Sequence, residues 1–358
     1  MALIHVVIPV YNARPFLRDA VRSVLDQPCK DIEIILVDDG STDGSSELCD
    51  ELVVGESRIS VIHQQNRGVS AARNKGIERV LERERDGYIA FLDADDMWSG
   101  DFLDEETKSY LLCQYDLVGF LTARCNNAVT RHTSLSPMKE GIYRGGSTSV
   151  WLNSKQTFGS AFYALSVIEK YHLRFMEEIK ANEDLIFSMQ FKYLAKTLCL
   201  VNKRLYLYRN NTASASHKYK PALELFVPLI YAYLQSDELM EKYQNEERGV
   251  LKEGRAMAAV YIVDVFEEHY KQWGSKRALT KMMQENPKFE ELITSSFAFN
   301  RPDSGLRWQT MIARPTAFRI KNNIKGIAKF VGQKIYRTIM RIPCVAQYLD
   351  RIRYPIAI

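Results

Sequence analysis

The chain of 358 residues lacks the features that mark secreted and membrane-spanning proteins. Its six cysteines include no Cys-x-x-Cys pair, which argues against a zinc site and a disulfide framework and favours a reducing compartment. No run of about 18 apolar residues occurs, so we expect no membrane-spanning helix. No basic leader precedes the strand-like segment that begins at Leu3. Together these absences predict a cytoplasmic protein.

No Gly-x-Gly-x-x-Gly motif follows a predicted strand, which disfavours a Rossmann dehydrogenase. Internal repeats and low-complexity segments are also missing. Hydrophobic residues make up 46% of the chain and charged residues 26%, as in a globular protein with a sizeable core. The formal charge of +4 is unevenly distributed, because residues 307–353 hold eleven Lys or Arg and one acid. The body of the chain is therefore mildly acidic and the tail strongly basic.

Alternating apolar and amphipathic segments in the first quarter of the chain predict an α/β fold. Strands are expected at residues 3–10, 32–37, 59–62 and 88–92, and helices at residues 14–27, 42–53 and 70–84. Thr42 is expected to cap the second helix. Because single helices separate the strands, we predict a right-handed, doubly wound, mostly parallel sheet. Residues 100–210 mix helical and strand-like patterns, and residues 221–299 are mainly helical.

Polar residues follow each of the four predicted strands. In strand order they are Tyr11 and Asn12; Asp38 and Asp39; Asn66, Gly68 and Arg73; and Asp93, Asp95 and Asp96. In an open α/β sheet, ligands bind outside the carboxyl ends of the strands. Four polar clusters at four such ends therefore predict a nucleotide cleft.

The three aspartates after the fourth strand carry the strongest signal. Like charges gathered at one strand end are unfavourable unless a cation neutralises them. A divalent metal that holds a diphosphate supplies that charge, because hard cations such as Mg²⁺ take oxygen ligands from carboxylates and phosphates together. The segment therefore predicts a metal-assisted nucleotide site.

Four motifs now carry a resemblance to a known family. They are Val7–Asn12, Val37–Asp43, Asn66–Asn74 and Phe91–Asp96. In this order and spacing they resemble the signature series of inverting family-2 glycosyltransferases of GT-A fold, of the type that builds bacterial surface polysaccharides. The resemblance covers residues 3–98 and extends more weakly to about residue 217. It implies a GT-A sheet whose first half is a Rossmann-like nucleotide-binding unit.

The resemblance also implies a donor site for a UDP-sugar. Asp39 would accept the uracil N–H, Arg73 would position the nucleotide, and Asp93 would approach the ribose or the metal. Asp95 would bind Mn²⁺ or Mg²⁺ across the diphosphate. The remaining residues expected at the nucleotide-sugar are Pro9, Tyr11, Asn12, Asp38, Asn66, Gly68 and Ala94. The alternative for the 38–43 segment is a turn with a helix cap, and Asp43 is expected to have only that role.

An inverting transfer needs one base that deprotonates the acceptor hydroxyl. Glu183 and Asp184 resemble the family's Glu-Asp pair at the start of a helix below the cleft. By that resemblance Asp184 is the candidate base and Glu183 its neighbour. The alternative is an ordinary helix start, because acids are favourable near the positive end of a helix dipole.

Other residues leave two interpretations open. His217 either completes the metal shell or is an ordinary surface or core histidine. Arg209 either clamps a phosphate or is solvated, and Trp98 either stacks on a sugar or is buried. Residues 158–163 lack the lysine that many relatives carry in the segment facing the acceptor.

The tail carries a separate signal. Its apolar residues recur every three or four positions, and basic residues lie on the flanks. The apolar set is Ile320, Ile324, Ile327, Val331, Ile335, Ile339 and Ile342. A basic amphipathic helix of this kind can bind an anionic membrane surface, and the alternative is a helix docked on the body. Nucleic acid is not expected as a partner, because the tail lacks interleaved aromatic residues and the cleft is acidic.

These features predict a GT-A domain at residues 1–215, a helical module at 216–306 and a basic amphipathic tail at 307–358. The predicted activity is metal-dependent transfer of a sugar from a UDP-sugar to a saccharide hydroxyl of a lipid-linked acceptor, at the inner face of the cell membrane. Two alternatives remain, a sugar-1-phosphate nucleotidyltransferase and a non-catalytic protein that binds a nucleotide-sugar. The first normally needs a Gly-rich basic phosphate loop, which residues 12–15 do not supply.

Overall fold

The computed structural model describes residues 3–84, 86–126, 129–134, 140–144, 158–178 and 183–209. All of them belong to one compact unit of the chain. His217, the expected helical module and the expected tail lie outside these residues. Within the described ranges, no helix has the length and apolar character needed to cross a bilayer.

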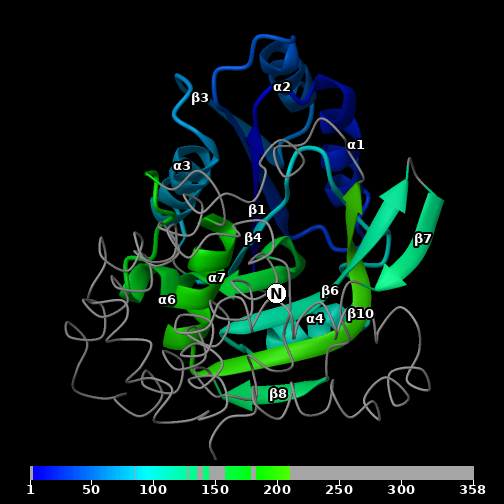
Figure 1. Ribbon diagram of the computed structural model, residues 1–358, viewed down its shortest axis with the longest axis vertical. Coiled ribbons are helices and arrows are strands. Elements are labelled where there is room, and N and C mark those ends of the chain that lie inside the picture. Colours follow the sequence, from blue (N-terminus) through cyan, green and yellow to red (C-terminus); the bar gives the residue numbers. More distant parts are fainter. Residues whose placement is uncertain are drawn as a thin grey trace, which may run out of the picture. The chain divides into compact units, whose positions relative to one another are not determined.

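The first half of the fold is a parallel sheet wound by helices on two sides. Its strands are β1 (Ile4–Val10), β2 (Ile32–Asp38), β3 (Ile59–His63) and β4 (Tyr88–Phe91), in the spatial order β3-β2-β1-β4. The helices are α1 (Arg14–Leu25), α2 (Ser45–Val53) and α3 (Val69–Leu81). Figure 1 shows α3 on one side of these strands and α1 and α2 on the other. The predicted doubly wound arrangement is confirmed for this half.

One predicted boundary is wrong. Thr42 does not cap α2, because the helix begins at Ser45 after Gly44, which has a φ of 87°. The polar groups before the helix are engaged in the turn instead. The Thr42 N–H donates to Oδ1 of Asn12 at 2.8 Å, and Oδ1 of Asp43 accepts from the N–H of Ser45 at 2.9 Å. Asp43 thus has the local turn role that the sequence predicts.

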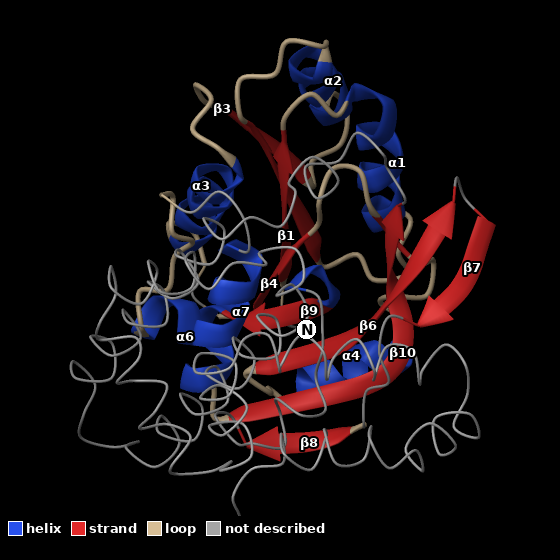
Figure 2. Ribbon diagram, viewed as in Figure 1, coloured by secondary structure: helices blue, strands red, loops and turns tan. Residues whose placement is uncertain are grey.

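The second half continues the same sheet with mixed strand directions (Figure 2). β9 (Ala161–Ala164) lies antiparallel between β4 and β6 (Leu117–Asn126), and β10 (Thr197–Arg209) runs parallel to β6. Three short strands, β5 (Met97–Trp98), β7 (Val129–Ser134) and β8 (Gly141–Arg144), extend this half. The helical elements are α4 (Glu105–Leu112), the 3-10 turn η1 (Phe158–Ser160), α6 (Leu165–Lys170) and α7 (Glu183–Leu194).

An aromatic cluster joins the two halves beneath the strand ends. The ring of Phe91, at the end of β4, has its centroid 4.7–6.0 Å from the centroids of four other rings. These rings belong to Phe158, Tyr163, Phe175 and Phe187. Because each aromatic ring buries a large apolar area, the packing of these rings stabilises the positions of η1 and the start of α7 against β4.

Burial answers two questions that the sequence leaves open about residues near this cluster. Trp98 is 2% exposed and packs edge-on against Phe102, so it belongs to the core and not to a sugar-stacking surface. Residues 158–163 are also buried, and a side chain at Gly159 would collide with the ring of Tyr206. This segment, which comprises η1 and the first residues of β9, therefore belongs to the core.

Candidate functional site

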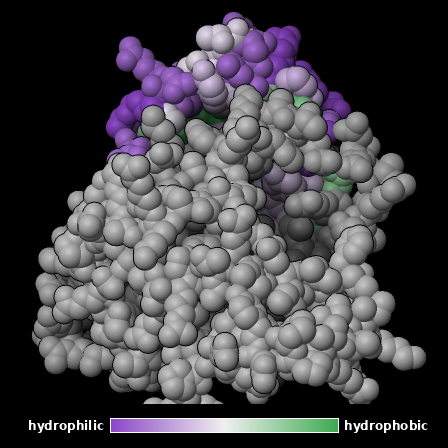
Figure 3. All heavy atoms as spheres, in the orientation of Figure 1, coloured by the Kyte–Doolittle hydropathy of each residue, from purple (hydrophilic) through white to green (hydrophobic). Residues whose placement is uncertain are grey.

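The carboxyl ends of β1, β2 and β4 lie at one edge of the sheet. Val10 pairs in register with Asp38, and the N–H of Asp39 donates to the carbonyl oxygen of Val10 at 2.8 Å. The two chain segments that leave β1 and β2 therefore run side by side. Tyr11, 52% exposed, stands at this edge, while Pro9 is buried inside β1. The described surface near α1, α2 and α3 is largely hydrophilic (Figure 3).

Asp39 holds the loop that follows β3. Its Oδ1 accepts from the Gln64 side chain at 2.8 Å and from the Arg67 N–H at 2.9 Å. Its Oδ2 accepts from the N–H of Gly68 at 2.8 Å, where a φ of 94° favours glycine. An ionised carboxylate has about four acceptor positions, so Oδ2 keeps room for one further donor such as a base N–H. Asn66 lies exposed in the same loop.

Arg73 of α3 is a buried link between two parts of the edge. Its guanidinium, 4% exposed, donates to Asp93 at 2.8 Å and to Glu183 at 2.9 Å. It also lies over the rings of Phe158 and Phe175, at 5.0 and 5.3 Å from their centroids. Burial lowers the pKa of Arg73, but the carboxylates of Asp93, Glu183 and Asp184 outweigh it and raise the pKa. The arginine thus stays charged and joins the end of β4 to the start of α7.

The three aspartates after β4 have different surroundings. Asp96 is 2% exposed, and its carboxylate accepts from the Tyr206 hydroxyl at 2.6 Å and from the Arg209 N–H at 2.8 Å. Burial, followed by the charges of Asp93 and Asp95, raises the pKa of Asp96 well above its ordinary value. Asp93 and Asp95 remain partly exposed, and Ala94 between them is buried. Asp96 therefore supports the edge from inside, while the other two face outward.

These residues fit a metal that is shared with a substrate. Among the described residues, no group of three His, Cys, Asp or Glu side chains could hold a metal ion. Mg²⁺ and similar cations commonly bind through one or two carboxylates, several waters and substrate phosphates. Asp95 and Asp93 supply that kind of donor set, so the edge fits a metal held jointly by the protein and a diphosphate.

The start of α7 places Glu183 and Asp184 beside this edge. Glu183 is 12% exposed and is the partner of Arg73. The charge of Asp184 acts on Arg73 and on the buried Tyr163. The candidate base is thereby brought within the electrostatic reach of the residues that end β4, although about ninety residues separate them in the sequence.

The structure adds residues that the sequence did not single out. Gln64 supports Asp39, and the Tyr206 hydroxyl binds Asp96. His63, the last residue of β3, lies 3.0 Å from Asp38. A signal for His63 was present, because this histidine directly follows the predicted strand at residues 59–62 and the carboxyl ends of parallel strands lie at one edge of the sheet.

Arg209 is buried, so it is not the solvated residue that was one of its two expected roles. Its Nε donates to the backbone oxygen of Asp95 at 3.0 Å, and its guanidinium lies 3.3 Å from Asp19. Arg209, at the end of β10, therefore holds the backbone of the aspartate segment and links it to Asp19 of α1.

The comparisons with known proteins agree with this arrangement. Residues 5–169 match the family model described as glycosyl transferase family 2. These residues therefore belong to this family of glycosyltransferases, as the four motifs predict.

Particular relatives make the likeness more specific. The uncharacterized glycosyltransferase EpsJ of Bacillus subtilis is 32% identical over 231 residues, which cover 62% of this chain and 65% of EpsJ. The putative teichuronic acid biosynthesis glycosyltransferase TuaG of the same organism is 39% identical over 121 residues, which cover 33% of this chain and 46% of TuaG. The chain thus spans less than two thirds of either relative.

A solved structure shows the fold. The crystal structure of S. aureus TarS in complex with UDP-GlcNAc superposes with a TM-score of 0.61 over 82% of this chain and 85% of that chain, at 19% identity. The predicted GT-A fold is confirmed by this likeness.

Proposed function

We propose that the protein is a metal-dependent, inverting glycosyltransferase that moves a sugar from a UDP-sugar to a saccharide hydroxyl. The acceptor is proposed to be a lipid-linked precursor of a surface polysaccharide. The observation that carries the proposal is the buried link through Arg73, which joins Asp93 at the donor edge to Glu183 beside the candidate base. A transferase needs its base close to the anomeric carbon of the bound donor. The Arg73 link supports this arrangement, because it ties the donor edge to the helix that carries the candidate base.

The residues divide the chemistry between binding and proton transfer. Asp39 accepts the N–H of the uracil ring, and Tyr11 lines the base pocket. Asp95 and Asp93 would hold Mn²⁺ or Mg²⁺, which would offset the charge that grows on the leaving UDP. The acceptor oxygen attacks the anomeric carbon, the bond from that carbon to the β-phosphate oxygen breaks, and Asp184 takes the hydroxyl proton. Attack and departure occur in line, so the configuration at the anomeric carbon inverts.

The relatives support the choice of donor and pathway. One solved TarS structure contains UDP and another contains UDP-GlcNAc, and TuaG is named for teichuronic acid biosynthesis. The basic tail supports the acceptor class, because cationic amphipathic segments bind anionic membrane surfaces. Membrane binding by the tail is tested by co-sedimentation of the protein with anionic vesicles at low and high salt. If neutral vesicles sediment as much protein as anionic vesicles do, the tail gives no support to a lipid-linked acceptor.

Slow hydrolysis of the donor separates an enzyme from a protein that only binds nucleotide-sugars. We expect the purified chain to release UDP from at least one UDP-sugar without an acceptor, because water can replace the acceptor hydroxyl. This release should require Mn²⁺ or Mg²⁺ and should be lost when Asp95 is replaced by Asn. A panel of UDP-sugars, assayed with the metal and with a chelator, measures it. Tight binding of a UDP-sugar with no release at any metal concentration would favour the binder.

A further inference from the structure

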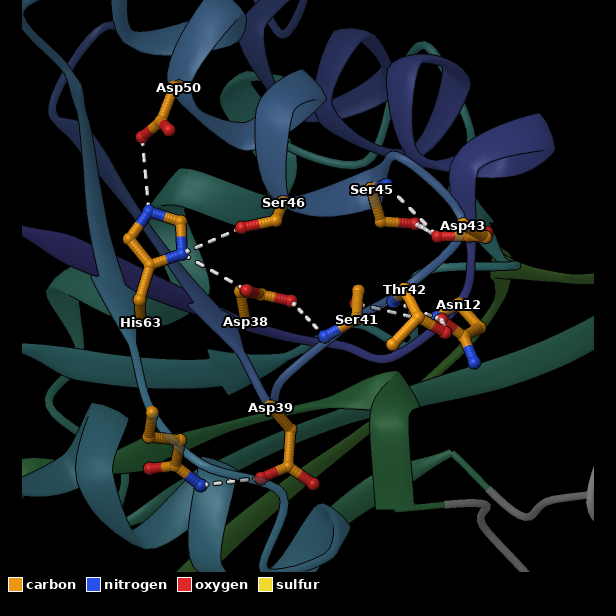
Figure 4. A network of polar contacts seen from close by, with 11 residues as sticks. Asn12, Asp38, Asp39, Ser41, Thr42, Asp43, Ser45, Ser46, Asp50 and His63 are labelled. Carbon is orange, nitrogen blue, oxygen red and sulfur yellow. Dashed lines mark hydrogen bonds and ion pairs between the residues drawn. The ribbon is translucent and has the colours of Figure 1, made fainter.

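The two adjacent aspartates at the end of β2 have different partners. Asp38 is opposite His63 in the parallel register of β2 and β3. Its Oδ2 lies 3.0 Å from Nδ1 of His63, and its side chain is 3% exposed. The carboxylate of Asp39 points the other way, toward the loop after β3 (Figure 4). Only Asp39 therefore faces the loop of the predicted nucleotide site.

His63 is held between carboxylates of two elements. Nδ1 faces Asp38 of β2, and Nε2 lies 3.0 Å from Oδ1 of Asp50 in α2. The hydroxyl of Ser46, also in α2, lies 3.2 Å from Nδ1. We call Asp38, His63 and Asp50 the clasp. Asp38 and Asp50 are the charged groups that act on the ring.

The protonation state of His63 decides how well the clasp holds. A neutral imidazole has one N–H and one lone pair, so it can donate to only one of the two carboxylates. The imidazolium donates to both. The hydrogen bond with Asp38 raises the pKa of His63, and this effect outweighs the lowering caused by burial. Burial raises the pKa of Asp38, but hydrogen bonds from Ser41 and His63 outweigh it and lower the pKa.

The other oxygen of Asp38 connects the clasp to the donor edge. Oδ1 accepts from the N–H of Ser41 at 3.0 Å, and the Ser41 hydroxyl accepts from the N–H of Asn12 at 3.1 Å. Oδ1 of Asn12 in turn accepts from the N–H of Thr42. Asn12 has a φ of 51°, which is uncommon for a residue other than glycine, and its contacts with Ser41 and Thr42 hold it there. Gly40 has a φ of 72°, which glycine adopts freely. The clasp thus fixes the turn beside Tyr11.

We propose that Asp38 and His63 are positioning residues that hold residues 38–44 in place for the donor base, and that neither touches the nucleotide. This assignment rests on the proposed function, because it divides roles within the donor site. Asp38 and Asp39 are both buried, and both oxygens of each have partners, so the direction of the side chains distinguishes them. The partner of Asp38 on the neighbouring strand is His63, whereas Asp39 binds the loop after β3 that borders the predicted nucleotide site. We therefore assign the direct contact with the nucleotide to Asp39 and an indirect role, through the turn, to Asp38.

The clasp makes donor binding depend on pH. Because the pKa of His63 is raised in the folded protein, its stabilising contribution is complete below the ordinary histidine value of about 6.5. The contribution is lost as the pH rises through the pKa of the folded state. We therefore expect the affinity for UDP with Mn²⁺ to weaken about fivefold across this titration, the lower end of ordinary coupling between sites.

Calorimetric titration of UDP with Mn²⁺ into the full chain, repeated across pH, tests the proposal with two variants. In His63→Asn the amide nitrogen takes the place of Nδ1 and donates to Asp38 at every pH. Because this variant holds Asp38 but not Asp50, as the neutral imidazole can, we expect it to show the high-pH affinity of the wild type at every pH. In His63→Ala the donor is gone, so the affinity should be weak and equally independent of pH. The matched control is His172→Asn, an exposed histidine with a φ of 51°, which should keep the wild-type pH profile.

Hydrogen exchange provides a readout that needs no ligand. At a pH below the ordinary histidine pKa, the amides of residues 38–46 should exchange faster in His63→Ala than in the wild type and His63→Asn. Peptides from α3 should exchange alike in all three and thereby report intact folding.

The outcomes separate the two proposals. If the wild type binds no UDP at any pH, the proposed function fails, and the exchange rates alone decide on the clasp. If the wild type binds UDP and His63→Ala binds it equally well, or if residues 38–46 exchange alike in both, the clasp is overturned while the donor site stands.

Discussion

Replacing Asp184 with Asn is expected to lower the rate of sugar transfer by roughly 10²–10⁴-fold, the usual contribution of a positioned general base. The amide cannot take the proton of the acceptor hydroxyl, while its size and shape hardly change. UDP binding should stay nearly intact, because the donor base and the diphosphate meet Asp39 and Asp95 instead. Transfer rates and UDP affinity measured on the same preparation give both quantities.

The neighbouring residue supplies the matched control for this prediction. Glu183→Gln keeps a side chain near Arg73 but weakens their ion pair. We expect it to change stability more than Asp184→Asn does, and to leave a working base in place. If Asp184→Asn loses UDP binding and transfer to the same extent, Asp184 is not the base.

Replacing Arg73 with Met is expected to destabilise the protein by about 3–5 kcal/mol, the range for removing one partner of a buried ion pair. The change leaves Glu183, 12% exposed, without the cation that compensates its charge. It also removes the guanidinium from the faces of Phe158 and Phe175. Urea unfolding followed by circular dichroism measures the free energy of unfolding.

Two further variants show whether the loss of stability in Arg73→Met comes from the missing charge or from the changed shape of the side chain. Arg73→Lys keeps the charge but can no longer bind Asp93 and Glu183 with two separate nitrogens, so it should recover only part of the loss. Adding Glu183→Gln to Arg73→Met should restore stability, because the uncompensated carboxylate is gone. An Arg73→Met variant as stable as the wild type would contradict the structural role of the link.

The first half of the fold was predictable because its signals are local. Each of β1, β2, β3 and β4 is a short apolar run, and amphipathic helices separate them. The second half was not predictable, because β9 inserts antiparallel between β4 and β6. Strand order there depends on pairings between distant segments, and neither periodicity nor spacing encodes them.

The candidate site was predicted at the level of residue sets and not of individual partners. The sequence places Asp38 with Asp39 and Asp95 with Asp96, but neighbouring residues on an extended chain point to opposite sides. In the structure, Asp38 therefore pairs with His63, and Asp96 accepts a hydrogen bond from Tyr206. The link from Arg73 to Glu183 spans 110 positions, and no local pattern indicates it.

The most direct test of the account is a crystal structure with UDP and Mn²⁺, in which anomalous scattering locates the metal. We expect one Mn²⁺ bound by an Asp95 carboxylate oxygen and by oxygens of both phosphates, with the uracil N–H donating to Asp39. UDP bound at another edge of the sheet, or manganese far from Asp95, would contradict the claim that these strand ends form the donor site.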